Sequence, residues 1–539
     1  MKKLRNHEDH KSRNCEKRRT GFKALLGLAL LSSFITLSFM TLSGCGSSTS
    51  TESGPGGDVA AEAPRGLRVK QAGVTPGYVL FAPLLSGTTY LIDEDGQVVH
   101  TWESEYSPSG AVYFLENGNL IRTVREPVVE VFKGGGQGGR IQELTWDGKL
   151  VWEFVFASAD HLLHHDIELL PNGNILAISW EKKTVEEARQ AGRRPELTPE
   201  AGLWPDMIVE IEPIRPEGGR VVWEWHAWDH LIQDHDAEAE NYGDPAEQPW
   251  RININGDGKL QEIDPAELER LKALGYVPDD ADAEDLSSDL QHTNAVAYNA
   301  ELDQIVVSTH HFNELWVIDH STTTQQAAGS SGGRGGRGGD LLYRWGNPRT
   351  YGRGAETDQK LFGQHDVRWV RDGLPGAGHL TVFNNDLEGP EGKYSAILEI
   401  ATPLTSDGGY ELPESGAFGP AEPVWSYSAP DKVSFSSAFI SGAERLANGN
   451  TLICSGAQGR FLEVTSEGEI VWEYWTLFSG NVKNPDGSLP QPVGENTYAV
   501  FRVTKIPPGH SGLAGRDLKP LDPQPTPVKG PDVPAEGDE

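Results

Sequence analysis

Three histidines occupy equivalent places in a repeated phrase of this 539-residue chain. His165, His292 and His365 each lie seven residues before an Asn or Asp, and an Asp directly follows the first and the third. A neutral imidazole is a competent nucleophile near pH 7, and further imidazoles can exchange protons or hold developing negative charge. If the repeats are arranged in a ring, the three histidines will be brought together.

Two alternating phrases predict short strands separated by turns. One phrase is an apolar pair that leads to an aromatic residue, and it occurs six times. The other is a turn of the Asn-Gly type followed by a strand. A sheet unit repeated six times cannot cover its own apolar faces, and radial stacking solves this problem. We therefore predict an all-β fold, a six-bladed β-propeller over residues 65–510, closed by residues 497–503 or 78–81.

The strand before each turn is the natural innermost strand of a blade. Counting back seven residues from each turn gives five positions that would surround one mouth of the central channel: Gly110, His165, His292, His365 and Ser441. Helical and loop insertions fall between the blades. The longest covers residues 226–290, and a short helical piece is expected at residues 184–191.

The N-terminus is expected to be a processing segment. Residues 1–44 combine a basic start with an apolar run and resemble a lipoprotein signal peptide, which makes Cys45 the lipid-modified residue; an ordinary signal peptide is the alternative. Residues 45–64 are predicted to be a flexible tether, and the acidic, Pro-rich residues 511–539 a disordered tail. The expected location is the periplasmic side of the outer membrane or the cell surface, with the lipid as membrane anchor.

The charge of the chain limits its partners. The net charge is −33, and removal of residues 1–44, which hold nine basic and three acidic residues, would make it −39. Such an excess argues against nucleic acid or an anionic membrane surface as the main partner. With Cys45 acylated, only Cys454 would remain, so no disulfide is expected. No Gly-rich phosphate loop stands out, so nucleotide use has no support.

Residues 75–510 resemble the bacterial arylsulfate sulfotransferases. The resemblance rests on the ordered motifs His164-His165-Asp166, His292-Thr293-Asn294, Asp340 to Pro348, Gln364-His365-Asp366 and Gly442 to Asn450. It implies a ping-pong transfer of a sulfuryl group from an aryl sulfate ester to a phenol, with no cofactor for the chemistry. It also implies that His365 is the nucleophile, which becomes a sulfohistidine. His165 and His292 would bind sulfate and exchange protons, and Asn294 would donate to the sulfate.

The chain departs from that family at two points. His310 stands where characterised members have an arginine that grips the sulfate, and histidine does not replace its permanent charge and forked geometry. Either His310 acts protonated, or Arg344, Arg349 or Arg353 reaches in from the next blade. The family's N-terminal β-domain has no room before residue 77, which leaves the oligomeric state open.

Two alternatives remain. The chain could be a non-catalytic binding propeller, or its histidines could be ligands of Zn or Cu. Separately, the segment that begins at Asn253 resembles an EF-hand loop and precedes a helix expected at residues 265–274. It predicts a weak structural calcium site with side-chain ligands from Asn253, Asn255, Asp257 and Asp264.

Overall fold

The computed structural model describes residues 65–84, 86–260, 263–273, 276–480 and 498–526. The predicted signal peptide, Cys45 and the tether lie outside these residues. None of the helices within the described ranges has the length and apolar character needed to cross a membrane.

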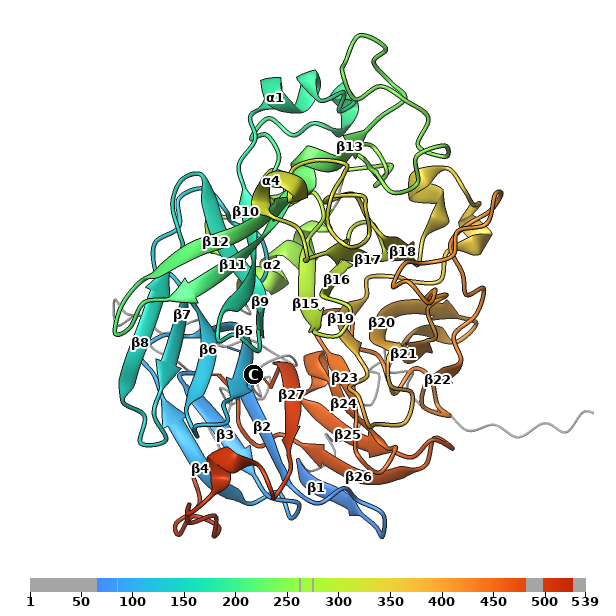
Figure 1. The fold of residues 1–539 in the computed structure, drawn as a ribbon. Coiled ribbons are helices and arrows are strands. Elements are labelled where there is room, and N and C mark those ends of the chain that lie inside the picture. Colours follow the sequence, from blue (N-terminus) through green and yellow to red (C-terminus); the bar gives the residue numbers. More distant parts are fainter. Residues whose placement is uncertain (1–64, 85, 261–262, 274–275, 481–497, 527–539) are drawn as a thin grey trace, which may run out of the picture. The chain divides into compact units, whose positions relative to one another are not determined.

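Six small sheets form a six-bladed β-propeller, as predicted (Figure 1). The strands of the first three blades, inner strand first, are β27 (Val500–Ile506), β2 (Tyr78–Pro83), β3 (Thr88–Ile92) and β4 (Val98–Glu103); β5 (Pro108–Phe114), β6 (Leu120–Arg125), β7 (Gly139–Leu144) and β8 (Leu150–Val155); and β9 (His161–Leu169), β10 (Ile175–Glu181), β11 (Asp206–Pro213) and β12 (Gly219–His226). Those of the last three are β15 (Thr293–Asn299), β16 (Gln304–Thr309), β17 (Glu314–Asp319) and β18 (Tyr343–Trp345); β19 (His365–Trp369), β20 (Leu380–Gly389), β21 (Gly392–Ile400) and β22 (Trp425–Tyr427); and β23 (Gly442–Arg445), β24 (Thr451–Ser455), β25 (Arg460–Val464), β26 (Ile470–Trp475) and β1 (Gly66–Lys70).

The ring is closed by strands from both ends of the chain. β27 pairs antiparallel with β2, so that Val503 faces Phe81 in the register, and β27 thereby supplies the inner strand of the first blade. The two segments predicted as alternative closing strands are thus partners in one sheet. β1 extends the last blade by pairing with β26.

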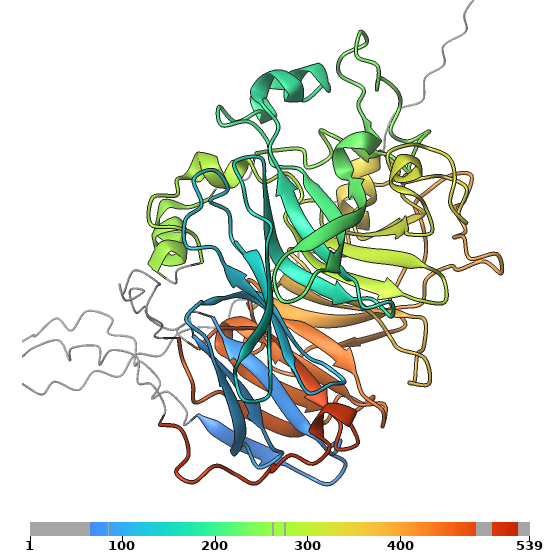
Figure 2. The same ribbon diagram turned by 60° about the vertical axis from the view of Figure 1, so that its left-hand side comes forward.

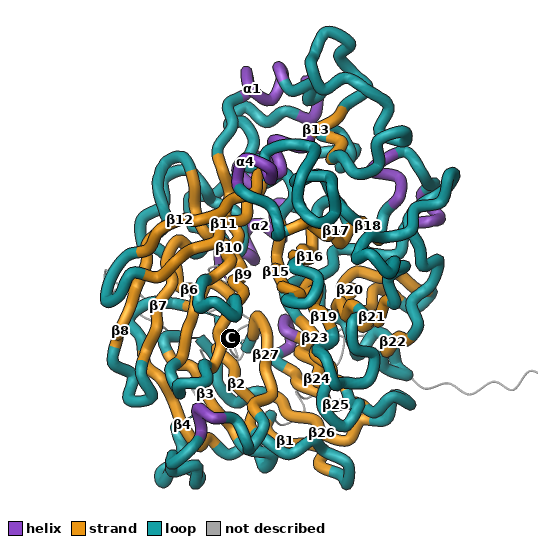
Figure 3. The backbone as a smooth tube through the Cα atoms, viewed as in Figure 1, coloured by secondary structure: helices purple, strands orange, loops and turns teal. Residues whose placement is uncertain are grey.

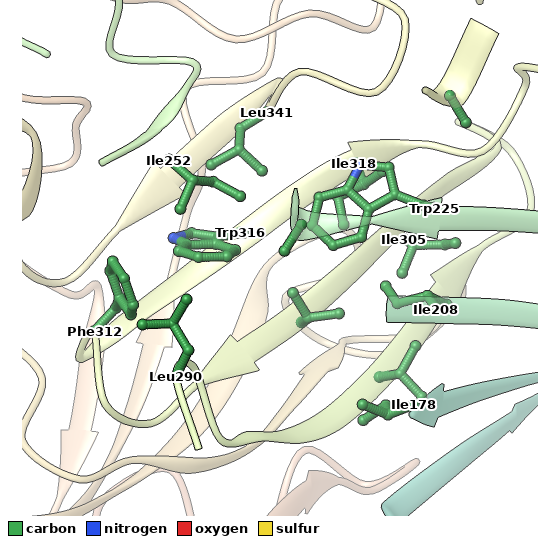
Figure 4. Close-up of a cluster of buried hydrophobic side chains, with 14 of the residues drawn as sticks. Ile178, Ile208, Trp225, Ile252, Leu290, Ile305, Phe312, Trp316, Ile318 and Leu341 are labelled. Atoms are coloured by element: carbon green, nitrogen blue, oxygen red, sulfur yellow. The ribbon is translucent and has the colours of Figure 1, made fainter. Parts of the chain in front are cut away.

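The aromatic residue of the repeated phrase lies on β4, β8, β12, β18, β22 or β26 and joins its blade to the next. In five of the six, its ring N–H or O–H donates to the following blade: Trp152 to Gly218 O (2.8 Å), Trp223 to Thr322 Oγ1 (3.2 Å), Tyr343 to Gly419 O (2.7 Å), Trp425 to Ser466 O (2.8 Å) and Trp472 to Glu94 O (2.9 Å). Apolar clusters fill the space between neighbouring sheets. In Figure 4, Ile208 and Trp225 of one blade and Ile305 and Trp316 of the next belong to one such cluster.

The helices are short and lie in the connections rather than in the blades (Figures 2 and 3). They are α1 (Val185–Gln190), α2 (Pro265–Ala273), α3 (Ala283–Ser287) and α4 (Thr324–Ala327), with the 3₁₀ turns η1 (Pro195–Leu197), η2 (Ala227–His230), η3 (Pro348–Tyr351), η4 (Glu356–Asp358), η5 (Gly456–Gln458) and η6 (Ser511–Leu513). The 226–290 insertion also contains β13 (Leu231–Ile232) and β14 (Ile252–Asn253), which pair in parallel.

The described part of the C-terminal tail is ordered, and the prediction of disorder for residues 511–526 is wrong. Leu513 is buried and Leu518 packs against the cluster that contains Trp102. The backbone N–H of Leu521 donates to Val98 O over 2.9 Å, and the side chain of Gln524 bonds both backbone polar groups of Val98. This segment is held by a few apolar residues and by backbone hydrogen bonds to the outer edge of the first blade. Its overall composition is polar and does not reveal these contacts. Residues 527–539 lie outside the described ranges.

Candidate active site

Unusual backbone geometry turns the candidate histidines toward one another. His165 and His292 have φ values of 53° and 51°, in the left-handed region that costs non-glycine residues energy, and Asp366 beside His365 has φ 56°. The register of β9, β15 and β19 shifts at these places. A bulge redirects the side chains that it carries, so the rings of His165 within β9, His292 just before β15 and His365 at the start of β19 are aimed away from the regular pleat.

The structure brings the three predicted catalytic histidines together with His310. Ring centroids are 4.6 Å apart for His165 and His292, 5.3 Å for His292 and His310, and 5.3 Å for His310 and His365. His165 and His365 are only 0% and 2% exposed, whereas His292 and His310 are partly exposed. The cluster is therefore approached from the side of His292 and His310.

The imidazole of His365 is held neutral, with one defined tautomer. Burial, opposed by its hydrogen bonds, lowers the pKa of His365 to about 3. Nδ1 lies 3.1 Å from Gly363 O and 3.0 Å from Asn385 Oδ1, which are both acceptors, so Nδ1 carries the proton. Nε2 consequently bears the lone pair and accepts from the backbone N–H of Ile440 over 3.2 Å. A neutral imidazole whose Nε2 bears the lone pair is the nucleophilic form.

His292 has the opposite electrostatic setting. Its Nδ1 lies 2.6 Å from Oδ2 of Asp289, a buried carboxylate. Burial alone would lower the pKa of His292, but the charge and hydrogen bond of Asp289 outweigh burial and raise it above 6.5. Burial and the neighbouring histidines hold the pKa of His165 and of His310 well below that value. Of the four clustered imidazoles, His292 is thus the one that favours the charged form.

Two further histidines contact the cluster: His164 contacts His165, and His311 contacts His292. Nδ1 of His164 lies 2.8 Å from Nδ1 of His165, and its Nε2 lies 3.2 Å from Oδ1 of Asp206. His311 stacks on His292 with centroids 5.0 Å apart, and its Nδ1 lies 2.9 Å from the Asp289 carbonyl.

Asn294 links the strands that carry two of the histidines. Its Nδ2 donates to the carbonyl of Gln364, the residue before His365, over 2.8 Å, and its side chain is fully buried. Oδ1 of this amide is buried without a hydrogen-bond partner among the described residues. The amide therefore connects the start of β15, beside His292, to the backbone directly before His365.

Arg344 does not reach the histidines, and its prediction as a substrate-binding residue is wrong. Its fully buried guanidinium pairs with both carboxylate oxygens of Glu314 and also donates to the carbonyl of Arg251 (2.9 Å) and to Thr350 Oγ1 (3.0 Å). The Arg344 donors that a sulfate would need are therefore already bonded to the buried carboxylate of Glu314 and to nearby oxygen acceptors. Arg353, another of the arginine candidates, donates to Ala246 O over 2.7 Å.

The EF-hand-like residues bond mainly to other parts of the chain. Both carboxylate oxygens of Asp257 accept from Arg193 (2.7 and 2.6 Å), Oδ1 of Asn255 accepts from Arg194 N (2.9 Å), Asn253 Nδ2 donates to Thr350 O (3.2 Å), and Oδ1 of Asp264 accepts from Ala266 N (2.7 Å) at the start of α2. Over the described ranges, no three His, Cys, Asp or Glu side chains converge as metal ligands. Calcium binding here stays a prediction.

Sequence reasoning missed the charged layer next to the histidines. Arg502, on the closing strand β27, donates to Oδ2 of Asp166 over 2.8 Å, and its Nε lies 2.8 Å from Oδ1 of Asp366. Tyr113 donates to Asp166 over 2.9 Å. One arginine therefore bridges the aspartates that follow His165 and His365. It lies on β27, the last inner strand in chain order, which lacks the Asn-Gly turn that identified the other inner strands. A cavity of about 380 Å³ lies among the far ends of the inner strands and is lined by this arginine and by Arg368.

Comparison with known families decides the identity of this architecture. The model of the arylsulfotransferase (ASST) family matches residues 84–475, which include all four clustered histidines and most of the propeller. The chain belongs to the arylsulfotransferase family. A search of curated proteins found no match.

Among solved structures, the arylsulfotransferase chain is similar to a protein of unknown function from Bacteroides caccae, with 12% identity, a TM-score of 0.39 and coverage of 80% of this chain and 99% of that one. It is also similar to virginiamycin B lyase from Staphylococcus aureus, with 10% identity, a TM-score of 0.31 and coverage of 82% and 99%. Similarities at this level carry no argument about activity.

Proposed function

We propose that this protein transfers a sulfuryl group from an aryl sulfate ester to a phenolic acceptor by a ping-pong mechanism, with His365 as the covalent carrier. Family membership supports a sulfotransferase acting on aryl sulfate and phenol. The observation that carries the assignment of roles is the convergence of four imidazoles of which only His292 favours the protonated form.

In the first half-reaction, the Nε2 lone pair of His365 forms a bond to sulfur while the bond from sulfur to the phenolic oxygen breaks. His292 gives its proton to the departing phenolate, so a neutral phenol leaves. The Nδ1 proton of His365 stays in place, held by Gly363 O and Asn385. The resulting imidazolium N-sulfonate is electrically neutral overall. In the second half-reaction, the acceptor phenol returns its proton to His292 and its oxygen takes the sulfuryl group.

The backbone N–H of Ile440 contributes to this chemistry because it meets Nε2 of His365. The bond of 3.2 Å must give way when Nε2 attacks sulfur. Once it is released, the same N–H lies close to the position of the sulfuryl oxygens, where a donor stabilises developing charge. Ile440 and Ser441, with φ values of 51° and 90°, place this group in the channel.

The decisive experiment detects the covalent intermediate. The protein is exposed briefly to a chromogenic aryl sulfate without acceptor, and peptides are examined by mass spectrometry for a sulfuryl adduct on His365. Wild type should carry the adduct and lose it on addition of phenol, and His365→Ala should show neither adduct nor transfer. The matched control is His235→Ala, because His235 is exposed and lies in the insertion. Full transfer activity in His365→Ala would end the assignment.

A non-catalytic binding propeller is the second candidate. It is favoured by the burial of His165 and His365 and by the occupied Nε2 of His365. A folded wild-type protein that transfers no sulfuryl group from a broad panel of aryl sulfates would favour binding over catalysis.

We also propose that the protein is exported and anchored through an acylated Cys45, with the propeller on the periplasmic side of the outer membrane or at the cell surface. The support is the sequence of residues 1–45 alone. Labelling with a radioactive fatty acid should mark the wild type and not Cys45→Ser. Equal labelling of both would refute the anchor.

A further inference from the structure

The carboxylate of Asp289 contacts His292, the histidine of the cluster that favours the charged form. Oδ2 of Asp289 meets Nδ1 of His292 at 2.6 Å, and Oδ1 accepts from the His292 backbone N–H (3.0 Å) and from Trp180 Nε1 (3.1 Å). Its backbone carbonyl faces Nδ1 of His311 at 2.9 Å. Asp289 is 3% exposed. A single buried residue therefore fixes the position, ring orientation and proton of His292.

Asp289 does not belong to the repeated phrase. It lies at the end of the 226–290 insertion, two residues after α3, and enters the ring from outside the blades. The bridge between Trp204 and Asp289 attaches this end of the insertion to the third blade. The insertion thus supplies a carboxylate to the histidine cluster.

We propose that Asp289 holds and positions His292 as a cation, whose Nε2–H binds the sulfuryl oxygens of the substrate before that proton passes to the departing phenolate. This inference rests on the proposed function and specifies how its site holds an anion. His292 presents Nε2–H while Asp289 holds Nδ1–H, so its charge is directed toward the partly exposed side of the cluster. A charge-assisted bond to an oxyanion is about twice as strong as a neutral one.

The titratable groups around His292 come from several elements. His165 and His164 face it from β9, His310 and His311 from the loop after β16, and His365 from β19. The carboxylates that raise its pKa are Asp289 and, from β11, Asp206.

His310 cannot take the same role. Burial and the adjacent imidazoles hold its pKa well below the usual value, and its Nδ1 has no hydrogen-bond partner in the described part of the chain. Asp206 is directed elsewhere, because its Oδ2 accepts from Thr293 N over 2.7 Å.

The test uses full-length protein and reads the proton on His292 without any turnover. The imidazole signals of ¹³C- or ¹⁵N-labelled protein are titrated by NMR, and His292 is assigned by its loss in His292→Gln. In wild type, His292 should titrate above 6.5 and the other three clustered rings below it. In Asp289→Asn, which keeps the shape and the Oδ1 acceptor, the midpoint for His292 should fall by at least about one pH unit. Asp280→Asn, an exposed position in the same insertion, should leave it unchanged.

Anion binding is measured separately, with inorganic sulfate as the probe. At pH 7, Asp289→Asn should weaken sulfate binding at least about tenfold, which corresponds to roughly 1.4 kcal/mol. A wild-type His292 that titrates below 6.5, or unchanged sulfate affinity in Asp289→Asn, would overturn the proposal. Because neither readout needs catalysis, failure of sulfuryl transfer would reject the proposed function while leaving this result to be judged by itself.

Discussion

The imidazole of His165 lies directly against Gly136. A Cβ atom at residue 136 would come within 2.2 Å of both Cε1 and Nε2 of this ring, a distance that no packing tolerates. The loop that carries Gly136 also accepts the His165 backbone N–H through the Gly136 carbonyl, over 2.8 Å. The absence of a side chain at residue 136 is therefore a condition for the position of His165 in the cluster.

Replacement of this glycine should impair the site more than the fold. Gly136→Ala introduces a contact with His165, whereas Gly148→Ala has the same φ of 75° and nothing within 4 Å of the new Cβ. Both variants bear the cost of a left-handed alanine, about 1–2 kcal/mol. Only Gly136→Ala should lower kcat/KM, by at least about tenfold, in assays below the unfolding temperatures of both. Equal activity in the two variants would show that His165 tolerates displacement.

The activity should fall as pH rises. His365 is neutral at all pH values above about 3, so the deprotonated nucleophile is present throughout the range from pH 5 to 9. His292 has a raised pKa, so its proton is present below that pKa and is lost as pH rises through it. A profile of kcat/KM should therefore be flat on the acid side and decline as pH rises through the raised pKa of His292. In Asp289→Asn the decline should begin at lower pH; a decline that does not move would contradict the role of Asp289.

Acid should destabilise the fold through the neutral histidines. His165, His310 and His365 have pKa values below the 6.5 of the unfolded chain, so the unfolded state binds more protons below pH 6.5. Each contributes a loss of stability of up to about 1.4 kcal/mol per pH unit as pH falls toward its folded pKa. Denaturation curves between pH 6 and 4 should show a shallower slope for His365→Asn than for wild type, while His235→Asn keeps the wild-type slope.

The ion pair between Arg344 and Glu314 should matter for stability alone. Arg344→Met leaves a carboxylate buried without its partner, which costs about 3–5 kcal/mol, and Arg344→Met with Glu314→Leu should recover most of that loss. Chemical denaturation measures both. At a temperature where all variants are folded, the KM for aryl sulfate should not change. A tenfold higher KM in the double variant would restore a substrate-binding role to Arg344.

Much of the fold could be predicted from the sequence because equivalent positions of a repeat occupy equivalent places in successive blades. The six aromatic phrases mark the outer strands, and the shared offset of His165, His292 and His365 places them within or next to the inner strands β9, β15 and β19. Contacts outside the repeat could not be predicted in this way. Asp289 arrives from an insertion and Arg502 from a strand without the turn signal.

Charge alone also misled the sequence interpretation. Arg344 was a candidate because it is cationic and close to the site in sequence, but sequence does not show that Glu314, thirty residues earlier, lies against it on the neighbouring strand. Asp257 likewise resembles a calcium ligand until Arg193 is found on both of its oxygens. Pairing between distant residues decides whether a charged side chain is available to a ligand.

The surroundings of the site depend on the closing strand β27, which comes from the C-terminal part of the chain. Residues 500–506 complete the first blade, and Arg502 among them neutralises the aspartates beside His165 and His365. A chain that ends before residue 500 would have an open ring and would lack the guanidinium that bridges Asp166 and Asp366, although Asp366 would still pair with Arg368. The surroundings of the clustered histidines are therefore complete only when the last strand of the propeller is in place.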